Sequence, residues 1–266
     1  MSWTLFTRTL YQRRTALLWY SVSLIAYSLF VSWYFPYLER MNITQYLNAF
    51  PKELIDAFAG SSGVSLSTFG GYTATEYLGV IWVLIIAAAA ISFSTKAISS
   101  EVAGGTMELL LAQPISRRVL VFTRWVAMIV YVGLLALATT APLYFGAVWR
   151  DVDVVGAHFV LLTVAAWCFA VALGSAALGL SAVFNESSRA AAIIGGTLGV
   201  MWLLSFMSAN LEWAKALNPV NVFHWWEPAR MIDKGTVAAG SWGLYAALIL
   251  AGLATALIVF PRRDVG

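Results

Sequence analysis

Residues 158–184 read HFVLLTVAAWCFAVALGSAALGLSAVF, and this stretch decides the fold class. It holds no Asp, Glu, Lys or Arg. A helix needs about 20 residues to cross the roughly 30 Å hydrocarbon core of a bilayer, and the stretch exceeds that length. The strands of a membrane β-barrel would instead show short segments of alternating polarity. The stretch therefore predicts a membrane-spanning helix.

The rest of the chain repeats this pattern. The sequence is 61% hydrophobic and 11% charged, which leaves too little polar surface to cover a soluble globule. Its apolar residues gather into six runs, each of spanning length: Ala16–Tyr37, Tyr77–Ile98, Val119–Phe145, His158–Phe184, Ala190–Ala209 and Ser241–Phe260. We therefore predict an all-α membrane protein with six transmembrane helices in a single transmembrane domain over residues 1–266.

The basic residues predict the orientation, because short loops rich in Lys and Arg stay in the cytoplasm. With the N-terminus inside, ten of the 16 basic residues and only four of the 13 acidic residues fall on the inner side. We expect both termini to be cytoplasmic, in a multi-pass protein of the inner (plasma) membrane. The net charge of +3 reflects this sidedness and does not indicate nucleic-acid binding.

The segments outside the runs carry some structure of their own. Residues 1–15 place Trp3, Phe6 and Leu10 on one helical face, which is typical of a helix lying in the membrane interface, although a frayed tail is an alternative. The apolar run that follows is too long for a cleaved signal peptide.

Two outer segments, 38–76 and 210–240, are too long for bare connections. In the first, Pro51–Gly60 has the Pro start and Gly stop of a short helix. In the second, aromatic residues interrupted by prolines predict short helices at the outer interface. We thus expect short outer helices before the second and the sixth span.

Several kinds of chemistry are missing from the sequence. No ionisable side chain lies near the middle of any run, which argues against an ion-coupled carrier. Cys168, His158 and His224 lack partners at a metal-binding spacing, and no phosphate-binding Gly-rich loop ending in Lys is present. We expect this chain to bind no metal or cofactor and to be no enzyme by itself.

The polar break between the second and third runs, residues 99–118, is more elaborate than a turn requires. Gly104 and Gly105 allow a sharp change of direction, Thr106 can cap a short helix, and Pro114 ends it. Ser116 can then cap the third span. The other residues offer apolar contact and charge to a partner: Glu101, Glu108, Leu109, Leu110, Leu111, Arg117 and Arg118. The alternative is a polar hairpin whose arginines extend to the lipid headgroups.

Residues 101–117, EVAGGTMELLLAQPISR, resemble the first cytoplasmic loop of ABC-2 type transporter permeases. The pattern of that loop runs roughly E-x-x-x-G-T-(hydrophobic)-E-x-L-L-A-x-P-(I/V)-S-R, and each position matches. The loop follows the second of six spans, as in the family. The Pro51–Gly60 helix and Leu217-Asn218-Pro219 resemble further family features, so the resemblance covers essentially the whole chain.

The resemblance implies that residues 99–118 form a coupling helix, which docks a separate cytoplasmic ATPase subunit that binds ATP and Mg²⁺. The coupling residues would be Glu101, Gly105, Thr106, Glu108, Leu109, Leu110, Leu111, Pro114, Arg117 and Arg118. It also implies pairing with a second permease subunit, as a homodimer or heterodimer, to form an exporter.

The substrate is not readable, although uncharged spans suit lipids, lipid-linked compounds or amphipathic compounds. One alternative is an ATPase-driven mechanical complex that remodels lipid or matures a partner protein without net transport. Another is a membrane sensor or immunity protein without an ATPase.

Two further sets of residues are weaker candidates. Ser92, Ser94 and Thr95 could face a substrate pathway at the inner end of the second span, although such hydroxyls often bond their own backbone. Gly195 and Gly199 allow close helix approach, either at a subunit interface or inside one subunit. Packing inside one bundle is the interpretation we favour for this pair.

Overall fold

The computed structural model describes residues 3–40, 67–103, 116–184, 187–208 and 211–262, with the backbone alone at 96–103 and 187. Every regular element in these residues is helical. The elements are α1 (Trp3–Arg40), α4 (Phe69–Thr73), the π-helix η1 (Ala74–Leu78), α5 (Ile81–Ala103), α7 (Arg117–Trp149), α8 (Gly156–Val183), α9 (Ser187–Met207), α10 (Glu212–Lys215), the 3₁₀-helix η2 (Asn218–Val220), α11 (Pro228–Lys234), α12 (Ala239–Val259) and the 3₁₀-helix η3 (Phe260–Arg262). The predicted all-α membrane fold is confirmed.

The six apolar runs all fall on helices. Five helices are long and apolar enough to cross a membrane: α1, α7, α8, α9 and α12, the last counted together with η3. A sixth span results if α4, η1 and α5, which bend by 48° at their junction, are taken as one. The run predicted to begin at Tyr77 therefore continues a helix that starts at Phe69, where Gly and Thr residues lower the hydropathy.

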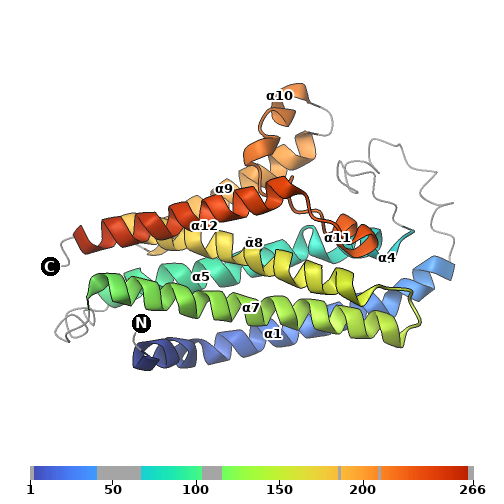
Figure 1. Ribbon diagram of the computed structural model, residues 1–266, viewed down its shortest axis with the longest axis horizontal. Helices are drawn as coiled ribbons and strands as arrows, with labels where there is room; N and C mark the ends of the chain where they lie inside the picture. The colour runs from blue at the N-terminus through green and yellow to red at the C-terminus, as the bar shows by residue number, and fades with distance from the viewer. Residues whose placement is uncertain (1–2, 41–66, 104–115, 185–186, 209–210, 263–266) are drawn as a thin grey trace.

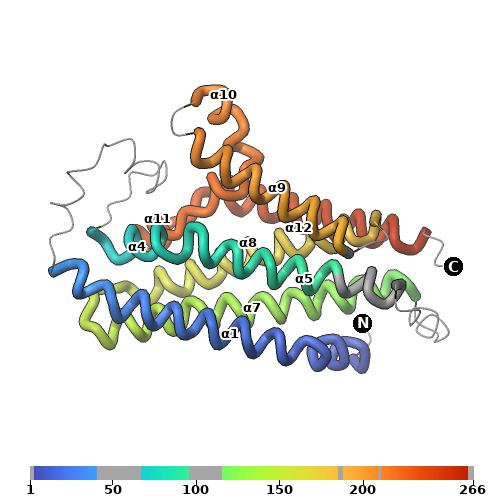
Figure 2. The backbone as a smooth tube through the Cα atoms, turned by 180° about the vertical axis from the view of Figure 1, so that it is seen from behind, coloured from blue at the N-terminus to red at the C-terminus, as the bar shows by residue number. Residues whose placement is uncertain are grey.

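The helices form an elongated bundle with α8 near its centre. In the most apolar part of α8, 61% of the residues are buried, against 17% in α9. Figure 1 shows the start of α1 and the end of α12 at the same end of the bundle as the start of α7. In the opposite view of Figure 2, α9 again leans away from the other long helices toward α10. Within the described residues, α7 and α8 are therefore well buried, whereas α1, α9 and α12 leave most of their most apolar parts exposed, α9 the most.

Small residues let α8 and α12 approach closely. A Cβ atom built on Gly179 would lie 2.8 Å from the carbonyl oxygen of Gly252, and one built on Gly252 would lie 2.7 Å from the backbone nitrogen of Ala176. These neighbours are backbone atoms and cannot move aside as a flexible side chain can. The glycines therefore set the distance between the two helices.

The start of α4 is held by a carboxylate from α11. Asp233 accepts hydrogen bonds from the Thr68 hydroxyl (2.6 Å) and from the backbone N–H of Gly70 (3.0 Å). Thr68 itself accepts from the N–H of Gly71 as the N-cap of α4. Two donors at the start of α4 are thereby satisfied, which explains why the helix begins eight residues before the apolar run.

The segment between α9 and α12 folds onto the bundle. Trp226 is only 5% exposed, stacks on Trp82 with ring centroids 4.8 Å apart, and donates its indole N–H to the carbonyl of Leu78 (2.8 Å). His158 bonds the carbonyl oxygen of Ile232 through Nδ1 (2.7 Å). The short helices predicted in this segment are present as α10, η2 and α11. The helix predicted at Pro51–Gly60 lies outside the described residues.

The N-terminal segment differs from its prediction as a separate helix. Residues 3–40 form one continuous helix, since nothing between Trp3 and Pro36 interrupts the hydrogen-bonding pattern. Phe6 and Leu10 pack partly against the core, whereas Trp3 is exposed and stacks on Phe6. The boundary predicted near residue 15 is therefore not a break in the helix.

Candidate functional site

Three of the predicted coupling residues are described, and they lie at the end of the bundle where α1 begins and η3 ends, here called the basic end. Arg117 and Arg118 are the first two residues of α7, and Glu101 lies in the last turn of α5. The remaining ones, Gly105, Thr106, Glu108, Leu109, Leu110, Leu111 and Pro114, lie outside the described residues. The structure therefore describes the two ends of this connection.

The end of the loop at α7 is firmly attached to the bundle. Ser116 caps α7, because its hydroxyl accepts a hydrogen bond from the N–H of Val119 (3.3 Å), as predicted. Arg117 donates to the carbonyl of Pro261 in η3 (3.5 Å), whereas Arg118 is exposed. The two arginines thus differ: one contacts the C-terminal helix, and the other is open to a partner.

A small apolar cluster lies close behind this attachment. It joins residues of α1, α7, α8, α12 and η3: Leu5, Leu120, Val121, Leu178, Ala182, Ala256 and Phe260. Four long helices and η3 therefore pack together directly behind the start of α7.

The charge at this end is strongly positive. Exposed arginines come from four segments: Arg8, Arg14, Arg118, Arg189 and Arg262. The described side chains of residues 3–20, 116–126, 188–192 and 256–262 include no Asp or Glu. Arg14 lies over the ring of Tyr11, with its guanidinium carbon 3.9 Å from the ring centroid. The surface is suited to contact phosphates or acidic protein groups.

The three candidates for a substrate pathway lie near this end of α5. The hydroxyl of Ser94 donates to the carbonyl of Gly174 in α8 (2.8 Å), and that of Thr95 donates to the carbonyl of Ile91 (2.8 Å). Both side chains are buried, whereas Ser92 is half-buried. Within this subunit, the Ser94 hydroxyl thus joins α5 to α8, and the Thr95 hydroxyl bonds the backbone of its own helix, which is the alternative named above. A pathway role for the three residues stays a prediction.

The glycine pair of α9 does not pack inside the bundle. A Cβ atom built on Gly195 or Gly199 would meet no atom of the described residues within 4 Å, and the same holds for Gly196 between them. The buried stripe of α9 is instead formed by Ala190, Ile194 and Leu198. The favoured interpretation of Gly195 and Gly199 as packing residues within one subunit is wrong. The sequence could not reveal this, because both sides of α9 carry small or apolar residues.

A family model described as ABC-2 family transporter protein matches residues 6–265, nearly the whole chain. The chain belongs to the ABC-2 transporter family. A search of curated proteins found no match. The match confirms the resemblance seen in residues 101–117 and identifies the chain as a permease, the membrane component of an ABC transporter.

Family membership gives this multi-pass permease a transport role, and such permeases typically work with an ABC ATPase. In the described part of the chain, no three residues among His, Cys, Asp and Glu are arranged to hold a metal ion. The basic end, with its capped helix and open arginine, is the candidate site for contact with a partner protein.

Proposed function

We propose that this permease is the membrane subunit of an ATP-driven exporter, and that residues 99–118 dock a separate cytoplasmic ATPase carrying ATP and Mg²⁺. The observation that carries the proposal is the match of residues 101–117 to the coupling-loop pattern. The described residues on either side of this loop, the end of α5 and the start of α7, lie at the basic end of the bundle. Exposed arginines, the contact of Arg117 with Pro261 and the apolar cluster behind the start of α7 support docking at this end. The same distribution of charge supports a cytoplasmic location of both termini in the plasma membrane.

The proposed substrates are lipids, lipid-linked compounds or amphipathic compounds. Among the described residues, one charged side chain is buried, that of Arg124. It lies near the start of α7 rather than at its middle. An interior without mid-membrane charge favours uncharged or amphipathic cargo over small ions. Each class can be tested by its effect on ATP hydrolysis.

The test begins with affinity purification of the tagged permease from native membranes. We expect an ABC ATPase to co-purify, and reconstitution of the complex in proteoliposomes should give ATP hydrolysis that an exported compound stimulates. Hydrolysis that no compound stimulates, accompanied by lipid rearrangement, would favour the mechanical alternative. Absence of an ATPase from the purified material would contradict the proposal and favour a stand-alone membrane protein.

We further propose that two permease subunits pair through α9. Gly195 and Gly199 are exposed one turn apart and present only backbone, which is typical of helices that associate closely in membranes. The neighbouring exposed side chains Val200, Trp202 and Leu203 add apolar surface. A second subunit of the same or a related sequence would cover this face.

Replacing Gly195 and Gly199 together by Ile should weaken self-association about tenfold or more, since tenfold corresponds to only about 1.4 kcal/mol. The fold should be preserved, because a Cβ atom at either position meets no described atom of the subunit within 4 Å. Stepwise photobleaching of single labelled molecules in vesicles measures the dimer fraction. Gly243→Ile on α12, which is equally open, is the matched control. An unchanged dimer fraction in the double variant would place the interface elsewhere.

A further inference from the structure

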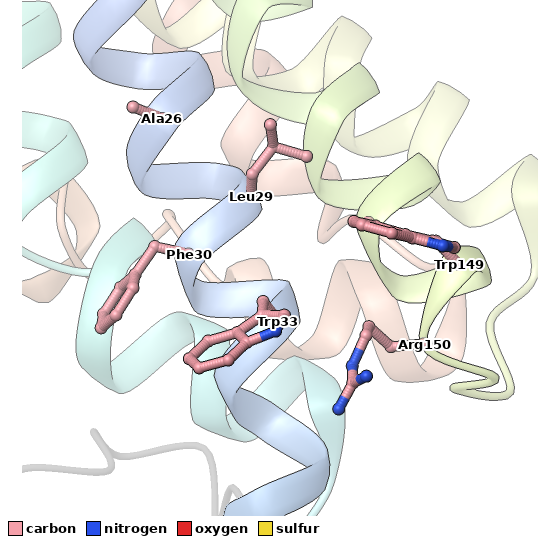
Figure 3. Close-up of a pocket in the computed structure, with 7 residues that line it drawn as sticks. Ala26, Leu29, Phe30, Trp33, Trp149 and Arg150 are labelled. Carbon is pink, nitrogen blue, oxygen red and sulfur yellow. The ribbon is translucent and has the colours of Figure 1, made fainter.

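A hollow of about 300 Å³ opens between α1 and α7 at the end of the bundle opposite the basic end. Its lining is apolar and aromatic except for one arginine: Ala26, Leu29, Phe30, Trp33, Gly146, Trp149 and Arg150. Figure 3 shows Trp33 on α1 and Arg150 at the end of α7 on opposite sides of this hollow. A single cation in an otherwise apolar wall points to a ligand with one anionic group and a hydrocarbon part.

The guanidinium of Arg150 has unused hydrogen-bonding capacity. Its Nε atom is buried and has no hydrogen-bond partner among the described residues. The guanidinium carbon lies 5.4 Å from the ring centroid of Tyr37, a contact that leaves the N–H donors unused. The ion pairs seen in the described residues are Lys215–Glu212 and Arg230–Glu227, and neither involves Arg150. A buried donor without an acceptor is unfavourable, and the planar fork of arginine fits phosphate oxygens well.

The surroundings place this arginine at the depth of lipid headgroups. Trp33 is 44% and Trp149 is 77% exposed, and exposed tryptophans gather at the boundary between membrane and water. From Trp33, the apolar wall extends back along α1 to Ala26, a distance of about 10 Å at 1.5 Å per residue. The wall is therefore long enough to contact the upper part of an acyl chain, the part next to the headgroup.

We propose that the hollow binds one glycerophospholipid from the adjacent leaflet. Its phosphate accepts hydrogen bonds from Arg150, and the upper part of one acyl chain lies along Ala26, Leu29 and Phe30. The proposal depends on the membrane location of the chain and not on ATPase coupling or on the cargo. It assigns a structural lipid to the contact between α1 and α7, where Ser32 donates to the carbonyl of Leu143 (2.9 Å) beside the same hollow.

Native mass spectrometry of the full-length chain, titrated with dioleoylphosphatidylglycerol, tests the site. We expect the original chain to retain one lipid tightly. Arg150→Gln should raise the dissociation constant for this lipid by about tenfold or more, because a charge-assisted hydrogen bond is lost. Ala26→Trp fills the apolar side of the hollow from an exposed position and should weaken retention independently. Dioleoylglycerol, which lacks the phosphate, should bind weakly to all forms.

The matched control is Arg40→Gln, which removes an exposed positive charge from the same end of α1 but does not line the hollow. It should leave the affinity for the lipid unchanged. An equal loss in Arg40→Gln would indicate diffuse attraction to surface charge and overturn the proposal. So would lipid retention in Arg150→Gln within twofold of the original chain, or binding of glycerol 3-phosphate as tight as that of the lipid.

Discussion

Changing Leu109 and Leu110 together to Asp should release the ATPase from this permease while its helices stay inserted. Each leucine buried on docking contributes about 1.5–3 kcal/mol, and the introduced carboxylates add a cost of burying charge. Loss of roughly 3 kcal/mol or more corresponds to at least a hundredfold weaker binding. The amount of ATPase retained by the tagged permease after detergent extraction measures the effect.

The control for this change is Gln113→Asp, which adds a negative charge to the same loop without removing a leucine. It should retain most of the ATPase, so that loss of binding in the double variant is assigned to lost apolar contact rather than to charge. Protease protection in membranes should show that the double variant is still inserted. If the ATPase stays bound to the double variant, residues 109–110 do not dock it.

The second large effect is expected at Gly252, where Gly252→Ala should separate α8 from α12. The added methyl group would lie 2.7 Å from the backbone nitrogen of Ala176 and against the Ser175 carbonyl, so the helices must shift apart along their contact. Overpacking of this kind costs about 1–3 kcal/mol and sometimes more. Thermal unfolding followed by circular dichroism in detergent should show a clearly lower midpoint.

Gly243→Ala is the control for this helix, because a Cβ atom at Gly243 meets nothing within 4 Å. Alanine favours a helix over glycine by roughly 1 kcal/mol, so the midpoint should stay equal or rise. An unchanged midpoint for Gly252→Ala would mean that α8 and α12 tolerate a wider spacing, and that their glycines do not determine the packing.

Much of the candidate site could be predicted because its signals are local. The cap at Ser116 follows from a serine placed directly before an apolar run, and the basic end follows from the distribution of arginines along the chain. The contact of Arg117 with Pro261 could not be predicted, since it joins residues far apart in the sequence. The same is true of Asp233, whose hydrogen bonds to Thr68 and Gly70 hold the start of α4.

Glycines give the clearest contrast. Gly195 and Gly252 occur in similar apolar runs. A Cβ atom built on Gly252 would meet the backbone of a neighbouring helix, whereas one built on Gly195 would have no described atom within 4 Å. No property of the local sequence separates the two, because contact depends on which face of each helix meets another. Arg150 is similar: its position beside a hollow depends on how α1 lies against α7.

By itself, the sequence determined that this protein is an all-helical membrane permease of the ABC-2 family, with its coupling-loop pattern after the second apolar run. Hydropathy and loop motifs carry that information because transfer into lipid depends on the composition of about 20 consecutive residues. Only the tertiary structure decided the early, bent start of the second span, the burial of Trp226, the open face of α9 and the hollow at Arg150. These features arise from contacts between helices, and such contacts depend on the relative rotation and spacing of segments distant in the chain.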